Sequence, residues 1–184
     1  MYHHKYYMNE YERVLNENLI HNTRLKKEVL VYYEKQNRQN LSYTQVPPLQ
    51  QAYITDISNI QHKIYILNFL LEIKKNRFLK VEMKIPKEYP FKCPSEILIN
   101  GFDYKYLLNF NPIYLKRLGY SDTKCLCCQS LYCKNNWSVS NNITHVLKEI
   151  YTNLNNKLRI RDIKMCRYLV EKKFGHYLPI EEFL

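Results

Sequence analysis

Four cysteines lie within nine residues of this chain, in the stretch KCLCCQSLYCKNNWSVS, which also holds the only tryptophan, Trp137. Thiolates bind soft metals and act as nucleophiles, so this stretch is where the sequence most clearly offers chemistry. Four thiolates are also enough ligands for a tetrahedral zinc ion. The cysteines of the stretch are Cys125, Cys127, Cys128 and Cys133.

A nucleophile or packed thiols fit this spacing better than a structural metal. Zinc sites usually take two cysteine pairs from separate turns, and the adjacent Cys127 and Cys128 are expected to point apart. The sequence therefore predicts no metal site, with a small zinc-binding protein kept as an alternative. The two remaining cysteines, Cys93 and Cys166, are expected to be packed thiols.

Composition predicts a soluble protein of a reducing compartment, the cytoplasm or the nucleus. The first residues form no apolar leader, and the apolar runs are too short to span a bilayer. In such a compartment cysteines are free thiols, ligands or nucleophiles more often than disulfides. No feature of the sequence calls for a cofactor.

The chain carries a net charge of +11. Such a charge favours an acidic partner, and nucleic acid is the first candidate. Lysine and arginine recur singly or in pairs along the whole chain, without a concentrated basic arm. Nucleic-acid binding is therefore an alternative hypothesis, and sequence-directed binding is not expected.

Residue periodicity predicts an α+β order in one domain, residues 1–184. A helix is expected over 9–35, with a break near Asn22, and then a meander of four antiparallel strands. The strands are AYITDIS, KIYILNFLLEI, RFLKVEMKIP and Glu96 to Ile99. The region 101–123 is expected to be irregular or partly helical. A helix capped by Asn142 and a last helix over 159–174, ended by Gly175, complete the order.

Three segments of the chain resemble, in the right order, motifs of ubiquitin-conjugating enzymes. PKEYPFKCPSEI is similar to the Tyr-Pro-Phe-x-x-Pro stretch after the third strand of that family, and the turn at Tyr89, Pro90 and Phe91 is expected to be packed. The Cys-Leu at Cys125 is similar to the one that carries the active cysteine. NNWSVSNNITHVLKEI is similar to the Trp-Ser-Pro and the helix after it. The resemblance covers about residues 24–155, is strongest to divergent members in large DNA viruses, and implies the UBC-like fold.

The resemblance implies that Cys125 carries ubiquitin, or a ubiquitin-like protein, as a thioester and transfers it to a lysine. Alignment backward from Trp137 gives Cys127 as an alternative nucleophile, and Cys128 is a third candidate. The implied partners are ubiquitin, its activating enzyme, a ubiquitin ligase and a protein substrate. In this family the N-terminal helix helps to dock the activating enzyme, so Arg24, Lys26 and Lys27 are candidate contacts.

The chain departs from the family pattern before and after the cysteine. The usual His-Pro-Asn, whose asparagine is credited with stabilising the oxyanion, is missing, and Asn109 and Asn111 in LLNFNPIY are the candidate replacements. Val139 stands where the family has proline. These departures leave a catalytically inactive UBC-like binding module as the alternative to an active enzyme.

Overall fold

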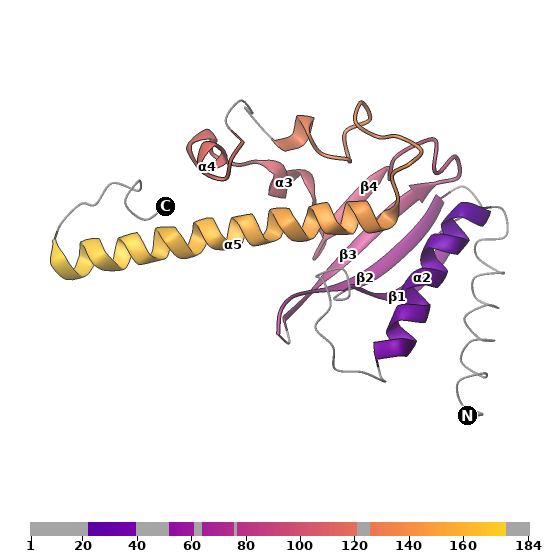
Figure 1. Ribbon diagram of the computed structural model, residues 1–184, viewed down its shortest axis with the longest axis horizontal. Helices are drawn as coiled ribbons and strands as arrows, with labels where there is room; N and C mark the ends of the chain where they lie inside the picture. Colours follow the sequence, from indigo (N-terminus) through magenta and orange to yellow (C-terminus); the bar gives the residue numbers. More distant parts are fainter. Residues whose placement is uncertain (1–21, 40–51, 61–63, 76, 121–125, 176–184) are drawn as a thin grey trace.

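The computed structural model describes residues 22–39, 52–60, 64–75, 77–120 and 126–175. Within these ranges the chain forms one helix, a sheet, two short helices, a 3-10 turn and a long helix, as Figure 1 shows. The elements are α2 (Thr23–Gln39), β1 (Ala52–Ile60), β2 (Ile64–Lys74), β3 (Arg77–Pro86), β4 (Glu96–Ile99), β5 (Phe102–Asp103), α3 (Lys105–Leu108), α4 (Pro112–Arg117), the 3-10 turn η2 (Leu126–Cys128) and α5 (Ile143–Phe174).

The sheet is an antiparallel meander in the order β1-β2-β3-β4-β5. The α+β class and the four predicted strands are therefore confirmed, but the prediction of only four strands is wrong. The fifth strand, β5, is two residues long, too short to show any alternation in the sequence. It pairs with β4 through a tight turn in which Asn100 and Gly101 both have positive φ, 49° and 84°. Such a turn suits the twist of a two-residue hairpin.

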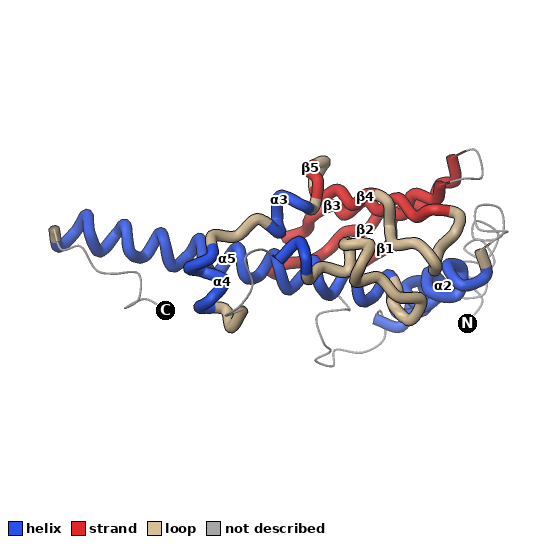
Figure 2. Tube along the Cα trace, turned by 90° about the horizontal axis from the view of Figure 1, so that it is seen from above, coloured by secondary structure: helices blue, strands red, loops and turns tan. Residues whose placement is uncertain are grey.

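Both helices that cover the sheet lie on the same face of it (Figure 2). Alternate residues of β2 and β3 point toward α2 and α5, because side chains alternate between the two faces of a strand. The core between these layers includes Leu25 and Val29 of α2, and Val146 and Ile150 of α5, each at most 2% exposed. The inward side chains of β2 and β3 are Tyr65, Leu67, Phe69, Leu71, Val81, Met83 and Ile85.

Helix caps agree with the sequence, whereas helix lengths differ. Asn22 accepts a hydrogen bond from the Leu25 amide and begins α2, as expected from the predicted break; residues 9–21 of the predicted helix lie outside the described residues. Asn142 caps α5 through the His145 amide, and Gly175 ends α5 with φ 67°.

The prediction of two C-terminal helices is wrong, because α5 is one helix of 32 residues. No glycine or proline occurs between its caps, so nothing in the chain interrupts the backbone ladder. In the described part of the chain, no helix combines the length and the apolar character that a membrane span requires.

Candidate functional site

The described part of the cysteine segment begins at Leu126, so Cys125 lies outside the described residues. Leu126 is buried at the start of η2, whereas Cys127 and Cys128 are exposed. The expectation that these two thiols point apart is wrong, because their Sγ atoms lie 3.9 Å from each other. Among the described residues, no group of three or more metal-binding side chains converges.

Glu149 of α5 binds the chain that follows the cysteines. One carboxylate oxygen accepts hydrogen bonds from Ser130 Oγ (2.5 Å) and from Tyr104 Oη (2.8 Å). The other oxygen accepts one from the Leu131 amide (2.7 Å). Asn153, one turn along the same helix face, donates to the Tyr104 hydroxyl at 2.8 Å. A carboxylate that accepts three hydrogen bonds holds its donors strongly, so Glu149 fixes this segment on a rigid helix.

The turn after η2 is closed by a second set of contacts. Asn136 Nδ2 donates to the carbonyl oxygens of Cys128 (2.5 Å) and Ser130 (3.1 Å). The Ser130 amide in turn donates to the Leu126 carbonyl at 3.0 Å. The exposed cysteines therefore sit on a short segment whose backbone is held at both ends of the turn.

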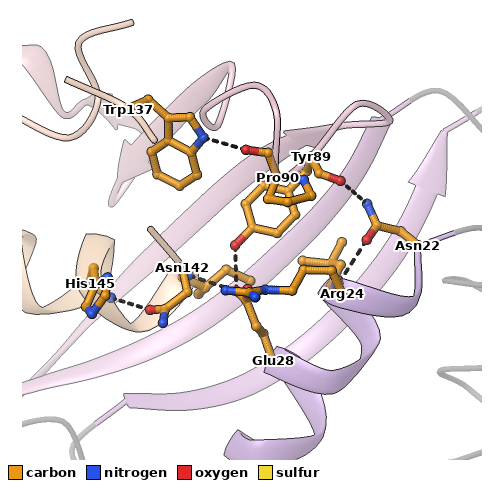
Figure 3. A network of polar contacts seen from close by, with 10 residues as sticks. Asn22, Arg24, Glu28, Tyr89, Pro90, Trp137, Asn142 and His145 are labelled. Carbon is orange, nitrogen blue, oxygen red and sulfur yellow. Dashed lines mark hydrogen bonds and ion pairs between the residues drawn. The ribbon is translucent and has the colours of Figure 1, made fainter. Parts of the chain in front are cut away.

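Glu28 of α2 joins three elements in a second network, drawn in Figure 3. Its carboxylate accepts hydrogen bonds from the Tyr89 hydroxyl (2.5 Å) and from the amide of Ile143, the first residue of α5 (3.0 Å). Arg24, one turn earlier, pairs with the other oxygen at 2.5 Å. An acidic side chain is favourable here, because it accepts from the positive end of a long helix dipole.

The loop after β3 is held by the same network. Tyr89 is 3% exposed, and the peptide bond between Tyr89 and Pro90 is cis. The Tyr89 carbonyl accepts a hydrogen bond from Asn22 Nδ2 at 2.8 Å. Burial, together with the Glu28 carboxylate, raises the pKa of the Tyr89 hydroxyl. Trp137 Nε1 donates to the Pro90 carbonyl at 2.7 Å (Figure 3). The expectation of a packed turn holds for Tyr89 but is wrong for Phe91, which is 80% exposed. The side chain of Phe91 therefore points out of this turn toward solvent.

The asparagines predicted to stabilise an oxyanion lie between α3 and α4. Asn111 is the N-cap of α4, with its side-chain oxygen accepting from the Ile113 amide at 2.9 Å. Asn109 is exposed, and its carbonyl accepts a hydrogen bond from Lys157 Nζ. It directly follows α3, and α3 contacts η2, so this loop approaches the cysteine segment. The predicted proximity to Cys125 lies outside the described residues.

The three basic residues predicted to meet a partner lie on the first turns of α2. Arg24 and Lys27 are exposed, and Lys26 is partly exposed. Arg24 also forms an ion pair with Glu28 inside the protein, so this side chain has a structural role in addition to being exposed to a partner.

A groove of about 660 Å³ is lined by the loop after β3 and by the chain around Trp137. Aromatic and basic side chains share its walls, and one of them, Tyr132, donates a hydrogen bond to the carbonyl of Ser95, another lining residue, at 3.2 Å. Cys93, expected to be packed, is only half-buried and lines this groove, and burial raises the pKa of its thiol. Cys166, expected to be packed, is instead exposed on α5. The lining residues are Pro86, Glu88, Phe91, Lys92, Cys93, Pro94, Ser95, Lys105, Tyr132, Lys134 and Trp137.

Sequence reasoning missed the residues that hold the site together. Glu28, Glu149 and Tyr104 each make contacts more than 15 residues away in sequence. An acidic residue on a helix is usually a solvated one, so the sequence offers no pattern that distinguishes these carboxylates from surface charges. No protein-family model, no curated protein and no solved structure matches the chain.

Proposed function

We propose that the chain is a ubiquitin-conjugating enzyme with a UBC-like fold, which carries ubiquitin or a ubiquitin-like protein on Cys125. The observation that carries this proposal is the hydrogen bond from Trp137 to the Pro90 carbonyl. The two residues belong to the two longest motifs that resemble the family, and they are 47 positions apart in sequence. The motifs occur in the order found in the family, they lie on an α+β chain, and two of them are in contact. These three points together support the architecture of the ubiquitin-conjugating enzymes for this chain.

The chemistry consists of two acyl transfers at one thiol. The Cys125 thiolate attacks the thioester that joins the ubiquitin carboxyl terminus to the activating enzyme; a new C–S bond forms and the thiol of the activating enzyme leaves. A substrate lysine amine then attacks the Cys125 thioester. The C–N bond forms, the C–S bond breaks, the amine loses a proton and Cys125 leaves as its thiolate. Neither step needs a metal or a cofactor.

Several described contacts suit such a nucleophile. Cys125 immediately precedes the buried Leu126. Glu149 of α5 then accepts a hydrogen bond from the amide of Leu131, which fixes the chain after the cysteines to that helix. A nucleophile that two large partners must reach needs a rigid base and an open approach. The neighbouring Cys127 and Cys128 are exposed and remain the alternative nucleophiles.

Asn109 is the better candidate of the two asparagines for the oxyanion donor. The Asn111 side-chain oxygen is used to cap α4, which orients that amide toward the helix. Asn109 is exposed and follows α3, the helix that contacts η2. If neither amide stabilises the tetrahedral oxyanion, the donor lies elsewhere; the inactive binding module is instead distinguished by its failure to form a ubiquitin thioester.

Two surfaces suit the partner proteins. We assign the activating enzyme to the first turns of α2, at Arg24, Lys26 and Lys27. The groove beside Trp137, with Phe91 exposed at its rim, suits an apolar side chain of a ubiquitin ligase. An exposed aromatic side chain beside a groove is typical of a protein interface.

The experiment is a thioester assay on the full chain with ubiquitin, its activating enzyme and ATP, read by intact-mass spectrometry. We expect a ubiquitin adduct that thiol reductants remove. Cys125→Ser should give an adduct that resists reductants, because an oxyester exchanges with thiols far more slowly. Cys127→Ser and Cys128→Ser, as matched controls, should keep the reducible adduct. No adduct with the intact chain refutes the enzyme and favours the binding module.

The oxyanion assignment is tested separately in single-turnover discharge to free lysine. Loss of one oxyanion donor costs about 3 kcal/mol, roughly 100-fold in rate. Asn109→Ala should slow discharge by that order while thioester loading persists. A wild-type discharge rate in both Asn109→Ala and Asn111→Ala places the donor elsewhere.

A further inference from the structure

The last half of α5 concentrates the positive charge of the chain. Residues 157–174 hold seven basic and two acidic residues, a net charge of +5 out of +11 for the whole protein. In the sequence the charge reads as diffuse, because lysine and arginine recur singly or in pairs along the whole chain. As one continuous helix, α5 instead carries this segment beyond the sheet, as Figures 1 and 2 both show.

One face of this segment has a regular composition. Helical neighbours lie three or four positions apart, and basic residues follow one another at such intervals with a single tyrosine among them. Of the two acidic residues of the segment, Asp162 lies off this row and contacts Arg161 at 3.1 Å, whereas Glu171 lies beside the row, three positions after Tyr168, and pairs with Arg167 at 2.8 Å. The row, named here the α5 row, is Lys157, Arg161, Lys164, Tyr168 and Lys172.

The outer part of the α5 row is open to solvent. Arg161, Lys164 and Lys172 are exposed, and Tyr168 is 56% exposed. Met165, beside Tyr168 on the same face, is 55% exposed. Ammonium and guanidinium groups on both sides of an exposed ring combine charge with an apolar, flat surface.

Two lysines of the α5 row also contact aromatic rings of the preceding chain. Lys157 Nζ lies 4.3 Å from the centre of the Phe110 ring, and Lys164 Nζ lies 4.9 Å from that of Tyr114 in α4. These contacts fix the two lysines without cancelling their charge. They also place α4, with its exposed Lys116, beside the row and extend the positive surface.

We propose that the α5 row is a binding site for single-stranded nucleic acid. Its basic side chains would contact successive phosphates, and Tyr168 would stack on a base. From Lys157 to Lys172 the helix rises about 22 Å, enough for roughly four nucleotides. Of the possible polyanions, a single strand is favoured because it offers both phosphates and accessible base faces. The carboxylates of an acidic peptide offer no flat ring for Tyr168 to stack on. An anionic membrane is disfavoured because Tyr168 and Met165 together form too small an apolar group to anchor the helix.

The test measures binding of the full chain to a fluorescein-labelled 12-nucleotide single strand by anisotropy between 50 and 200 mM salt. Four phosphate contacts give a salt slope of about −2.8, an affinity loss of about 50-fold over that range. In the double variant Arg161→Gln and Lys172→Gln, the loss should fall to about sevenfold. The matched control, Lys87→Gln with Lys148→Gln, removes the same charge from exposed positions elsewhere and should keep the wild-type slope.

A second pair of variants isolates stacking. Tyr168→Ala should weaken binding about tenfold with an unchanged salt slope, since base stacking is worth about 1–3 kcal/mol. Tyr106→Ala, at a tyrosine that is 73% exposed on α3, is the control and should bind as wild type. Circular dichroism of each variant verifies that the fold is kept.

Four results overturn the proposal. Equal losses in the two double variants mean that only net charge matters. The assignment to single strands fails if polyglutamate competes as well as the unlabelled single strand does. It also fails if a 12-base-pair duplex binds as tightly as the single strand and Tyr168→Ala does not weaken that binding. Binding to vesicles of phosphatidylcholine with 30% phosphatidylserine but not to the oligonucleotide reassigns the row to anionic membranes. None of these results bears on the thioester assay, so this inference and the proposed function fail independently.

Discussion

Glu149→Gln is the change that tests most directly whether α5 holds the cysteine segment. The substitution keeps the size of the side chain and removes one acceptor oxygen together with the charge. In the structure both oxygens are used, one by Ser130 and Tyr104 and the other by the Leu131 amide. Whichever way the glutamine amide turns, its NH₂ group faces at least one of these donors.

The magnitude follows from those contacts. A hydrogen bond to a charged group contributes about 1.5–3 kcal/mol, and one to a neutral group about 1 kcal/mol. Glutamine loses one bond and weakens the others, but Glu149 is only partly buried and solvent can replace some of what is lost. We expect a decrease of about 2 kcal/mol in the free energy of unfolding, equal to a Tm decrease of about 4–8 °C for a chain of this size.

Urea unfolding followed by circular dichroism measures the change in the free energy of unfolding. Hydrogen exchange shows which backbone amides lose protection. The Leu131 amide should lose protection in Glu149→Gln, because its acceptor is the substituted carboxylate. Glu96→Gln is the matched control; its carboxylate is 38% exposed and pairs with Lys84 at the surface, so we expect a change below about 1 kcal/mol. A Glu149→Gln chain as stable as the control, with the Leu131 amide still protected, would refute the role assigned to this carboxylate.

Two further changes probe the packing of α2 and α5. Burial raises the pKa of Tyr32 to about 12, so its neutral form stabilises the fold fully below pH 10, and about 3 kcal/mol of that stabilisation is lost as the pH rises to 12. Tyr32→Phe should therefore show a shallower alkaline loss of stability in urea unfolding between pH 9 and 11.5, and an identical slope would contradict this. Asn142→Ala removes the cap of α5 and should lower the unfolding free energy by about 1 kcal/mol, whereas Asn142→Asp should retain most of it.

The sheet and the helix caps could be predicted from the sequence because their causes are local. Alternation in RFLKVEMKIP reports directly which side chains of β3 face the core. Asn22, Asn142 and Gly175 act on backbone groups no more than four residues away. Local causes leave local patterns, and those patterns were sufficient for the fold class.

The site could be predicted only in part, because its contacts join distant segments. Nothing in the local sequence around Glu149 indicates that its oxygens face Ser130, 19 residues earlier. The motif resemblance predicts a packed turn for Tyr89, Pro90 and Phe91, and this is wrong for Phe91: Tyr89 is buried, whereas Phe91 is exposed. The direction of a side chain in an irregular loop depends on backbone dihedrals that composition does not determine.

The length of α5 has consequences for all of these features. Its first amide binds Glu28, its second turn holds the cysteine segment through Glu149, and its last turns carry the exposed part of the α5 row. A break near residue 156, as periodicity suggested, would let the last two groups move independently. An uninterrupted helix fixes the distance between them at 1.5 Å per residue, so Tyr168 lies about 28 Å along the axis from Glu149. A nucleic acid held on the row would therefore be kept at a set separation from the cysteine segment, because both are fixed to the same helix.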